Sequence, residues 1–322
     1  MRRLTRDQDK GAIGVFTAIT IVVLLGAVGL TIDVGAMYRE RRELRNGADA
    51  GALAIAEECA LGLSTCHPGP AFALAKDYGD ANASDGFADV VDVDLDLSAR
   101  TVTVHLGTLT DEGGTNFEPF FARVVGFDGT TVEARAVARW GFPSELWVHL
   151  PLIISECEFP GASVLPTPER VIYFHDGNNA EPCNAQAGQD ADGDGFLAGG
   201  FGWLETESGC EAYLVDARWY EADPGSSPTT GCNPSYVGSL VGQEVALPIF
   251  DDIVGVGTGG TYHIRGFALF HVTGYRFGGQ FNVNAPCQGD ERCVSGYFTS
   301  GVVYEGKSGG DDNGFVIIEL IG

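Results

Sequence analysis

The sequence is poor in basic residues. Its 322 residues include 19 Lys and Arg against 44 Asp and Glu, which gives a formal net charge of −25. The deficit is uneven, because residues 1–45 carry a net positive charge and the rest of the chain is strongly acidic. An acidic body of this size would repel phosphates, so the composition excludes nucleic-acid binding. It is typical of an exported soluble domain and is compatible with cation binding.

Motifs that carry catalysis are also missing. No G-x-S-x-G, H-E-x-x-H or phosphate-loop pattern occurs, and the glycine-rich run 255–260 lacks the Lys and the helix that a phosphate loop needs. The histidines have no companions at metal-binding spacing. Even His263 and His271, on one face of a predicted strand, would lie about 26 Å apart at about 3.3 Å per residue. We therefore expect a protein that is not an enzyme.

The eight cysteines lack the C-x-x-C spacing of zinc sites. Their even number favours disulfides in an oxidising compartment over free thiols in a cytosolic protein. Proximity in the sequence predicts the pairs Cys59–Cys66 and Cys287–Cys293. The other four are expected to pair among themselves: Cys157, Cys183, Cys210 and Cys232.

One stretch, residues 12–32, has no charged residue and no proline. As a helix it would span about 31 Å, close to the hydrocarbon thickness of a bilayer. The helical pattern continues to about Cys59, because apolar residues recur at three- and four-residue spacings with charged residues between them. We expect a cytoplasmic tail at 1–10, a transmembrane helix at 11–32 and a helical stalk at 33–66.

The orientation of this helix rests on the cysteines. Four basic residues precede the apolar run and four follow it, so the flanking charges do not decide. Disulfides persist outside the cytoplasm, which favours a cytoplasmic N-terminus and an extracytoplasmic body in a single-pass cell-membrane protein. A cleaved signal peptide is the alternative, with small residues near a cleavage site at 34–36. The length of the run and the continuing helix favour a retained anchor.

Three blocks of this helix carry a family resemblance: residues 11–16 (GAIGVF), 28–38 (VGLTIDVGAMY) and 42–54 (RELRNGADAGALA). They resemble the N-terminal segment of Flp/Tad (tight-adherence) pilus-assembly proteins of the TadG-like type, and residues 116–126 and 132–138 resemble that family's next elements. The resemblance implies a membrane-anchored, non-enzymatic accessory component that contacts other pilus-assembly proteins or pilins. Related pilin-like subunits have a Glu where this chain has Phe16, so prepilin processing is not implied.

Residues 67–141 are expected to form a small α+β domain of the kind found in pilin-like proteins. The patterns predict a helix at 71–80, a hairpin of strands at 91–97 and 102–106, a helix at 117–125 ended by Gly126, and a strand at 130–140. In the hairpin, the alternation predicts one buried face made of Val91, Val93, Leu95 and Leu97.

Residues 142–322 are expected to form a disulfide-stapled, mostly β exported domain, with sandwich and barrel both open. Short apolar runs alternate with Gly- and Pro-rich loops, and almost no helical pattern occurs. The fold class is therefore α+β, with the transmembrane helix continuing into a stalk. Strands are predicted at 148–155, 171–174, 212–216, 244–250, 261–275, 296–304 and 315–321.

The sharpest local motif is the run Asp190, Asp192, Asp194 followed by Gly195. Carboxylates at alternate positions with a glycine at the turn are typical of calcium loops, although Phe201 stands where the bidentate Glu would be. An acidic surface turn is the other interpretation. With calcium, the chain would be a surface-anchored calcium-dependent adhesive or ligand-binding module, which is the alternative to a role in pilus assembly.

Overall fold

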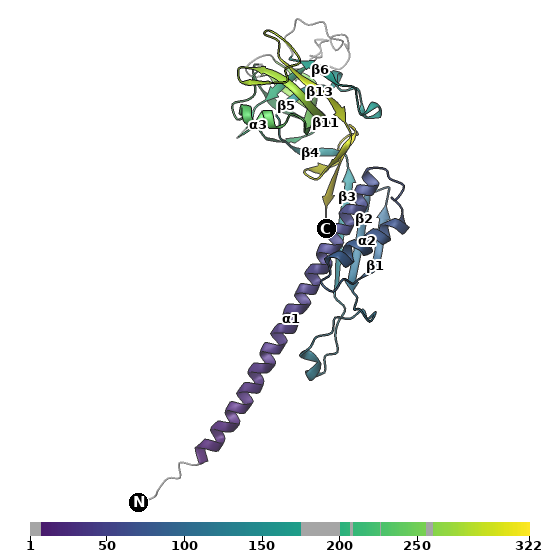
Figure 1. The fold of residues 1–322 in the computed structure, drawn as a ribbon, viewed down its shortest axis with the longest axis vertical. Helices are drawn as coiled ribbons and strands as arrows, with labels where there is room; N and C mark the ends of the chain where they lie inside the picture. Colours follow the sequence, from purple (N-terminus) through teal and green to yellow (C-terminus); the bar gives the residue numbers. More distant parts are fainter. Residues whose placement is uncertain (1–7, 175–199, 207–208, 226, 256–259) are drawn as a thin grey trace, which may run out of the picture. The chain divides into compact units, whose positions relative to one another are not determined.

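The computed structural model describes residues 8–174, 200–206, 209–225, 227–255 and 260–322 (Figure 1). The chain divides into two compact units. Unit 1 comprises residues 1–138 and 320–322, and unit 2 comprises residues 139–319. The chain leaves unit 1 within strand β3 (Glu133–Gly141) and returns at the end of strand β16 (Phe315–Leu320).

Unit 1 is built on helix α1 (Gln8–Ala60), which is continuous from the apolar run into the stalk, as predicted (Figure 1). Helix α2 (Pro68–Asn82) packs against its C-terminal half. Small residues allow this close approach, because a Cβ atom added at Gly47 would lie 3.0 Å from the Cα of Gly79. The buried hydrophobic side chains of α1 lie in this half: Leu44, Ala48, Ala52, Ile55 and Ala56.

Strands β1 (Ala88–Asp96), β2 (Thr101–Thr108) and β3 complete unit 1. The predicted hairpin is confirmed, since β1 and β2 pair in antiparallel fashion and the apolar residues of β2 are buried. The predicted buried face of β1 is partly wrong. A register shift between Val90 and Asp92 breaks the alternation, so Val91 is 45% exposed; Leu97 lies beyond the strand and is 58% exposed.

The helix predicted at 117–125 is mostly wrong. Only a short 3-10 turn, η1 (Ala122–Val125), forms there, because Phe117 is held in an extended bridge with Thr130. Gly126 ends the turn as predicted, with φ 88° in the left-handed region that glycine adopts without strain.

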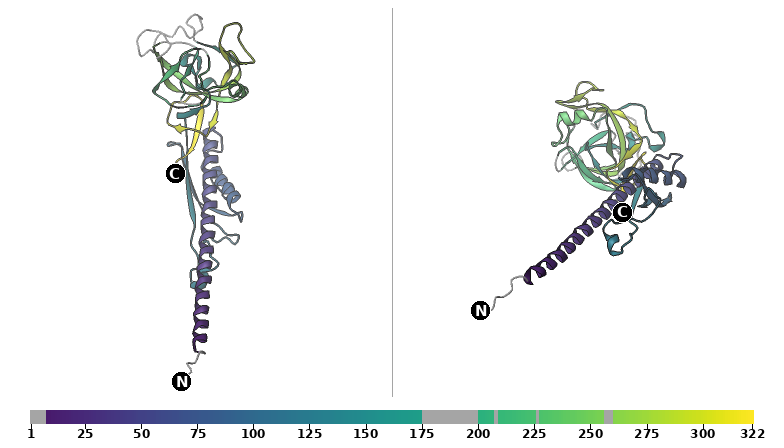
Figure 2. Two further views of the ribbon diagram at one scale, coloured as in Figure 1. Left: turned by 90° about the vertical axis from the view of Figure 1, so that its left-hand side faces the viewer. Right: turned by 60° about the horizontal axis from the view of Figure 1, so that its bottom comes forward.

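Unit 2 is mostly β, as predicted. Its largest sheet closes on itself, because pairing passes from β10 to β5, β7, β9 and β11 and then back to β10, which favours the barrel over the sandwich (Figure 2). The described strands of this sheet are β5 (Leu152–Ser155), β6 (Arg170–Tyr173), β7 (Phe201–Leu204), β9 (Arg218–Asp223), β10 (Glu244–Val254), β11 (Thr261–Gly278), β12 (Phe281–Val283) and β13 (Cys293–Thr299).

The remaining elements of unit 2 lie outside this sheet. Strand β4 pairs with β8 and β15, and β14 pairs in parallel with β16. Their bounds are β4 (Pro143–Val148), β8 (Ala212–Val215), β14 (Gly301–Val303), β15 (Lys307–Ser308), the short helix α3 (Pro234–Ser239) and the 3-10 turns η2 (Glu156–Glu158) and η3 (Ala162–Val164). The predicted strands 148–155 and 296–304 are each divided between two strands, and no strand was predicted at β7, β9, β12 or β15.

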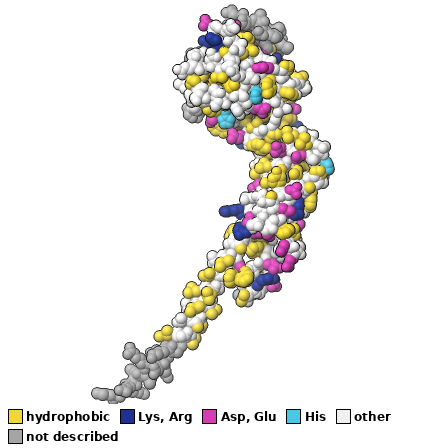
Figure 3. All heavy atoms as spheres, viewed as in Figure 1, with side chains coloured by type: hydrophobic (Ala, Val, Ile, Leu, Met, Phe, Trp, Pro, Cys, Tyr) yellow, Lys and Arg dark blue, Asp and Glu magenta, His cyan; other side chains and the backbone are white. Residues whose placement is uncertain are grey.

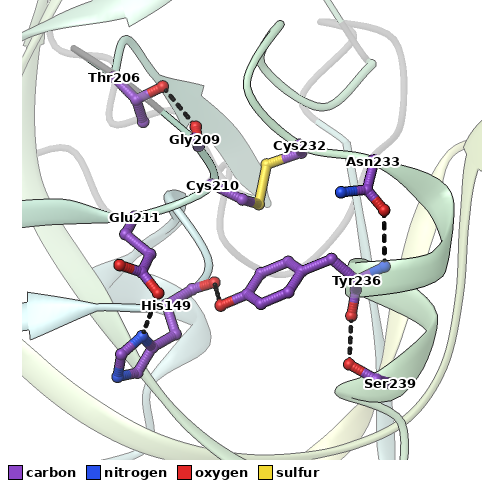
Figure 4. Close-up of a disulfide and its surroundings, with 9 residues drawn as sticks. All are labelled: His149, Thr206, Gly209, Cys210, Glu211, Cys232, Asn233, Tyr236 and Ser239. Carbon is purple, nitrogen blue, oxygen red and sulfur yellow. Dashed lines mark hydrogen bonds and ion pairs between the residues drawn. A yellow bond between two sulfur atoms is a disulfide. The ribbon is translucent and has the colours of Figure 1, made fainter.

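The disulfides follow the predicted pattern. Cys59–Cys66 and Cys287–Cys293 form, and Cys210 pairs with Cys232 from within the predicted group of four (Figure 4). Cys157 is also disulfide-bonded. Among the described cysteines none is free.

Candidate functional site: the base of the stalk in unit 1

The N-terminal part of α1 presents its apolar side chains to the exterior. From Ile13 to Ile32 the large hydrophobic residues are about half exposed or more, and Figure 3 shows them covering this part of the helix. Among the described residues, this is the one helix long and apolar enough to cross a membrane. Exposure of so large an apolar surface to water is unfavourable in free energy. This surface is therefore suited to contact with lipid or with other apolar helices.

Asp33, the first charged residue after the apolar run, is only 6% exposed. Its carboxylate accepts hydrogen bonds from three consecutive backbone N–H groups of the segment between β2 and β3, at 2.9 Å from Phe120, 2.9 Å from Phe121 and 2.6 Å from Ala122. These are charge-assisted bonds, which are stronger than bonds between neutral groups. One carboxylate thus fixes the segment 117–127 to α1.

The same segment contacts α1 one turn earlier, at Gly29. A Cβ atom at this position would lie 2.8 Å from Cγ of Phe121, so only glycine admits the ring without a shift. Gly14 and Gly26, on the same apolar stretch, have nothing within 4 Å of an added Cβ. Gly29 and Asp33 lie four residues apart and therefore on one face of the helix, where together they form the docking site for segment 117–127.

A groove of about 950 Å³ follows on α1. It is lined by Gly35, Tyr38, Arg39, Arg41, Arg42, Arg45, His105, Glu133, Ala134 and Arg135. The lining carries five arginines and one glutamate, in a chain whose net charge is −25. The groove is therefore a local basic site on an acidic protein, and it favours an anionic ligand or an acidic protein segment.

Some of these arginines are held in place by bonds within unit 1. Arg39 Nε lies 2.9 Å from Glu43 Oε1, and Arg45 Nε lies 3.1 Å from Asp49 Oδ1. Burial acts to raise the pKa of Glu43, but hydrogen bonds from the N–H of Ser84 and from Arg39 outweigh it and hold this pKa below its usual value. Glu43 therefore stays ionised and orients Arg39.

Two arginines of the groove, Arg41 and Arg42, can bind an anionic group of a ligand. In the described part of the chain, Arg41 and Arg42 form no ion pair, and both are exposed. Burial raises the pKa of the neighbouring Glu40. The groove thus presents at least two guanidinium groups that can make charge-assisted, bidentate contacts with a carboxylate or phosphate.

The residues predicted to bind metal, Asp190, Asp192 and Asp194, lie outside the described residues. Within the described ranges, no group of three or more His, Cys, Asp or Glu could hold a metal ion. Several histidines instead pair with a carboxylate. His149 Nδ1 lies 3.0 Å from Glu211 Oε1 beside the Cys210–Cys232 disulfide (Figure 4), and His263 Nδ1 lies 2.6 Å from Asp251 Oδ1.

Sequence reasoning missed the docking site and the groove. The sequence did contain a signal for the docking site, because Gly29 and Asp33 lie four residues apart at the end of the apolar run. The groove has a weaker signal, because His105, Glu133 and Arg135 come from strands whose placement against α1 is a tertiary feature.

Comparison with known families identifies the segment that carries these features. Residues 11–56 match the model of the Tad family, described as Flp pilus-assembly TadE/G-like. The match covers the exposed apolar part of α1, Gly29, Asp33, the arginines of the stalk and most of the buried half of the helix. Comparisons with curated proteins and with solved structures gave no match.

Proposed function

We propose that this chain, whose N-terminal segment matches the Tad family, is a non-enzymatic accessory component of Flp/Tad pilus assembly. In this proposal α1 is retained as a single-pass membrane anchor with its N-terminus in the cytoplasm. Units 1 and 2 lie outside the cytoplasm, and they make contacts with pilins or other pilus-assembly proteins.

The observation that carries the proposal is the division of α1 into two parts within the matched segment. The first part exposes apolar side chains along a length that could span a bilayer, and the second part is the core of a folded unit. A cleaved signal peptide would not be expected to continue as an unbroken helix into the core of the mature domain. The disulfides support the extracytoplasmic location, because such bonds persist in oxidising compartments.

The retention of the anchor can be tested on protein extracted from membranes. Intact mass and N-terminal sequencing are expected to give a chain that includes residues 12–32. A mature start near Met37 would show signal-peptide cleavage and contradict the anchor. A start within residues 11–16 would show pilin-type processing instead.

The groove is the surface of unit 1 where we place a contact with an acidic segment of a partner. The test is cross-linking in cells that carry the pilus system, followed by purification of the full-length protein and identification of bound pilus-assembly proteins. Arg42→Glu is expected to reduce this recovery, because it reverses a charge in the groove. Arg218→Glu is the matched control, since it makes the same charge change at an exposed position in unit 2.

Equal recovery with Arg42→Glu and the wild type would remove the groove from the proposal. Absence of any pilus-assembly protein from the wild-type sample would contradict the proposed function itself. Thermal melting of each variant shows whether a loss of recovery reflects a lost contact or a lost fold.

A further inference from the structure

Segment 117–127, which Asp33 and Gly29 hold against α1, carries an exposed apolar surface of its own. Phe120 is 79% exposed, Val124 86%, Phe127 49% and Phe121 40%. Four large apolar side chains within eight residues is an unusual concentration for a segment that faces water. Unit 1 therefore leaves an apolar patch uncovered, on a segment whose backbone lies beside α1 (Figures 1 and 2).

The contacts with Gly29 and Asp33 determine the position of this patch along α1. Gly29 lies three residues before the end of the apolar run, which corresponds to roughly 4–5 Å at about 1.5 Å per residue. Asp33 lies just past the end of that run. The apolar patch is thus level with the boundary between hydrocarbon and headgroups, and it continues the apolar surface of the membrane-spanning part of α1.

We propose that segment 117–127 is a second membrane contact, in which Phe120, Val124 and Phe127 insert into the outer leaflet beside α1. The inference rests on the anchor role proposed above. The occupant of the patch is lipid, because the patch is continuous with a helix surface that lipid would cover. Aromatic and aliphatic side chains at this depth are typical of elements that lie in the membrane interface.

The backbone of the segment is suited to such a place. Little water is available near the hydrocarbon boundary, so peptide groups there need partners within the protein. Asp33 accepts from the N–H groups of Phe120, Phe121 and Ala122. The N–H groups of Phe117, Val124, Gly126 and Phe127 donate to carbonyl oxygens within the segment or of Thr130, and Pro119 has no N–H.

The charges near the segment also fit an interface. Within it, Arg123 Nη2 lies 2.9 Å from Glu118 Oε2, so its two charges are paired. One to two turns beyond Asp33, Tyr38 is 66% exposed and is followed by Arg39, Arg41 and Arg42. An exposed tyrosine just above the apolar run is typical of the membrane interface, where amphipathic rings lie at the level of the headgroups.

The experiment is photo-cross-linking of the full-length protein in liposomes of phosphatidylcholine and phosphatidylglycerol. A benzophenone-bearing phenylalanine replaces one residue at a time, and mass spectrometry detects protein that has gained the mass of one lipid. Positions 120 and 124 test the inference. Position 24 is the positive control inside the apolar run. Position 72 is the matched negative control, because Phe72 is a 48% exposed phenylalanine on α2, which packs against α1 near Gly51.

Lipid adducts are expected at 24, 120 and 124 and not at 72. An adduct at 24 without adducts at 120 and 124 would overturn the inference and leave the anchor intact. Cross-links from 120 or 124 to a second copy of the chain, in place of lipid, would show that the patch is a protein interface and also overturn it. Failure at position 24 would overturn the anchor on which the inference depends.

Discussion

Asp33 and Gly29 determine where the segment between β2 and β3 lies on unit 1. Sequence patterns predicted a helix for residues 117–125, because Phe117, Phe120, Phe121 and Val124 recur at helical spacing. Phe117 is instead held in an extended bridge with Thr130, and the N–H groups of Phe121 and Ala122, which such a helix would bond to the carbonyls of residues 117 and 118, donate to the carboxylate of Asp33, 88 residues or more away in the chain. A side chain so distant in the sequence is invisible to a local pattern, which explains why that prediction failed.

Gly29→Val is expected to displace segment 117–127 from α1. An added Cβ meets three side-chain atoms of Phe121 within 2.9 Å, and valine adds two further methyl groups. Hydrogen exchange of the backbone N–H groups of Phe120 to Ala122 should then become faster, because Asp33 no longer protects them. Gly26→Val is the matched control, since nothing lies within 4 Å of its added Cβ. Unchanged exchange in Gly29→Val would show that the segment is held without this contact.

Tyr262 is expected to make the stability of unit 2 depend on pH in the alkaline range. Burial raises its pKa from 10.0 to about 12, so the folded state favours the neutral phenol. The resulting stabilisation is fully present below the unfolded pKa of about 10 and is lost as pH rises through the folded pKa of about 12. At about 1.4 kcal/mol per pKa unit, the loss amounts to roughly 3 kcal/mol.

The measurement is urea unfolding at several pH values between about 9 and 12, in which the fluorescence of unit 2 reports its unfolding. Tyr262→Phe is expected to lose less stability over this interval than the wild type, because the variant has no phenol to ionise there. Tyr304→Phe is the control at an exposed position. Parallel curves for the wild type and Tyr262→Phe would contradict the assignment.

At the scale of elements, the sequence predicts most of what periodicity can encode. Helix α1, helix α2, the hairpin of β1 and β2 and the long strand β11 all have clear periods, and all were found. β7 was missed because it is only four residues long and fully buried, so it has no alternation. The buried face of β1 was misjudged because a bulge changes the phase of alternation, and a bulge leaves no signature in the pattern.

The Cys210–Cys232 disulfide is expected to stabilise unit 2 more than Cys59–Cys66 stabilises unit 1. The first closes a sequence separation of 22 residues and the second one of 7, and the entropic stabilisation grows with loop length. Loop entropy alone predicts a loss of about 3.4 kcal/mol for the first and about 2.5 kcal/mol for the second. The double variant Cys210→Ala, Cys232→Ala should therefore lower the free energy of unfolding of unit 2 by more than Cys59→Ala, Cys66→Ala lowers that of unit 1.

Calorimetry of the purified protein tests this comparison, because a change in one unit appears in the transition of that unit. The Cys210–Cys232 bridge also lies next to α3, whose Tyr236 hydroxyl donates to the carbonyl oxygen of His149 at 3.0 Å (Figure 4). Loss of the bridge should weaken this contact as well. Equal losses of free energy of unfolding in the two double variants, each relative to the wild type, would show that loop length does not govern these two bridges.

At the scale of the whole molecule, the net charge follows from composition, whereas the basic groove does not. The chain is acidic throughout most of its length, and the groove arises only when arginines of α1 meet Arg135 of β3. The family match likewise covers residues 11–56, which all lie in α1 of unit 1. The one sequence motif in the second half that predicts a ligand is the acidic run at 190–194.

Calcium is expected to stabilise the protein through Asp190, Asp192 and Asp194. If they bind calcium, their three carboxylates repel one another in the empty loop, and metal binding stabilises the folded protein by RT ln(1 + [L]/Kd). Without a Glu at the twelfth position, we expect a Kd of about 10⁻⁴–10⁻³ M, so calcium at about 10 mM should contribute roughly 1.4–2.7 kcal/mol. The full chain should melt a few degrees higher in calcium than in chelator, and Asp192→Ala with Asp194→Ala should abolish the difference.

Magnesium should substitute poorly, because it requires a smaller octahedral site and retains its water. An unchanged melting temperature in the wild type would reduce the run to an acidic turn and remove the calcium-dependent adhesive module, while the pilus-assembly proposal, which rests on α1, would stand.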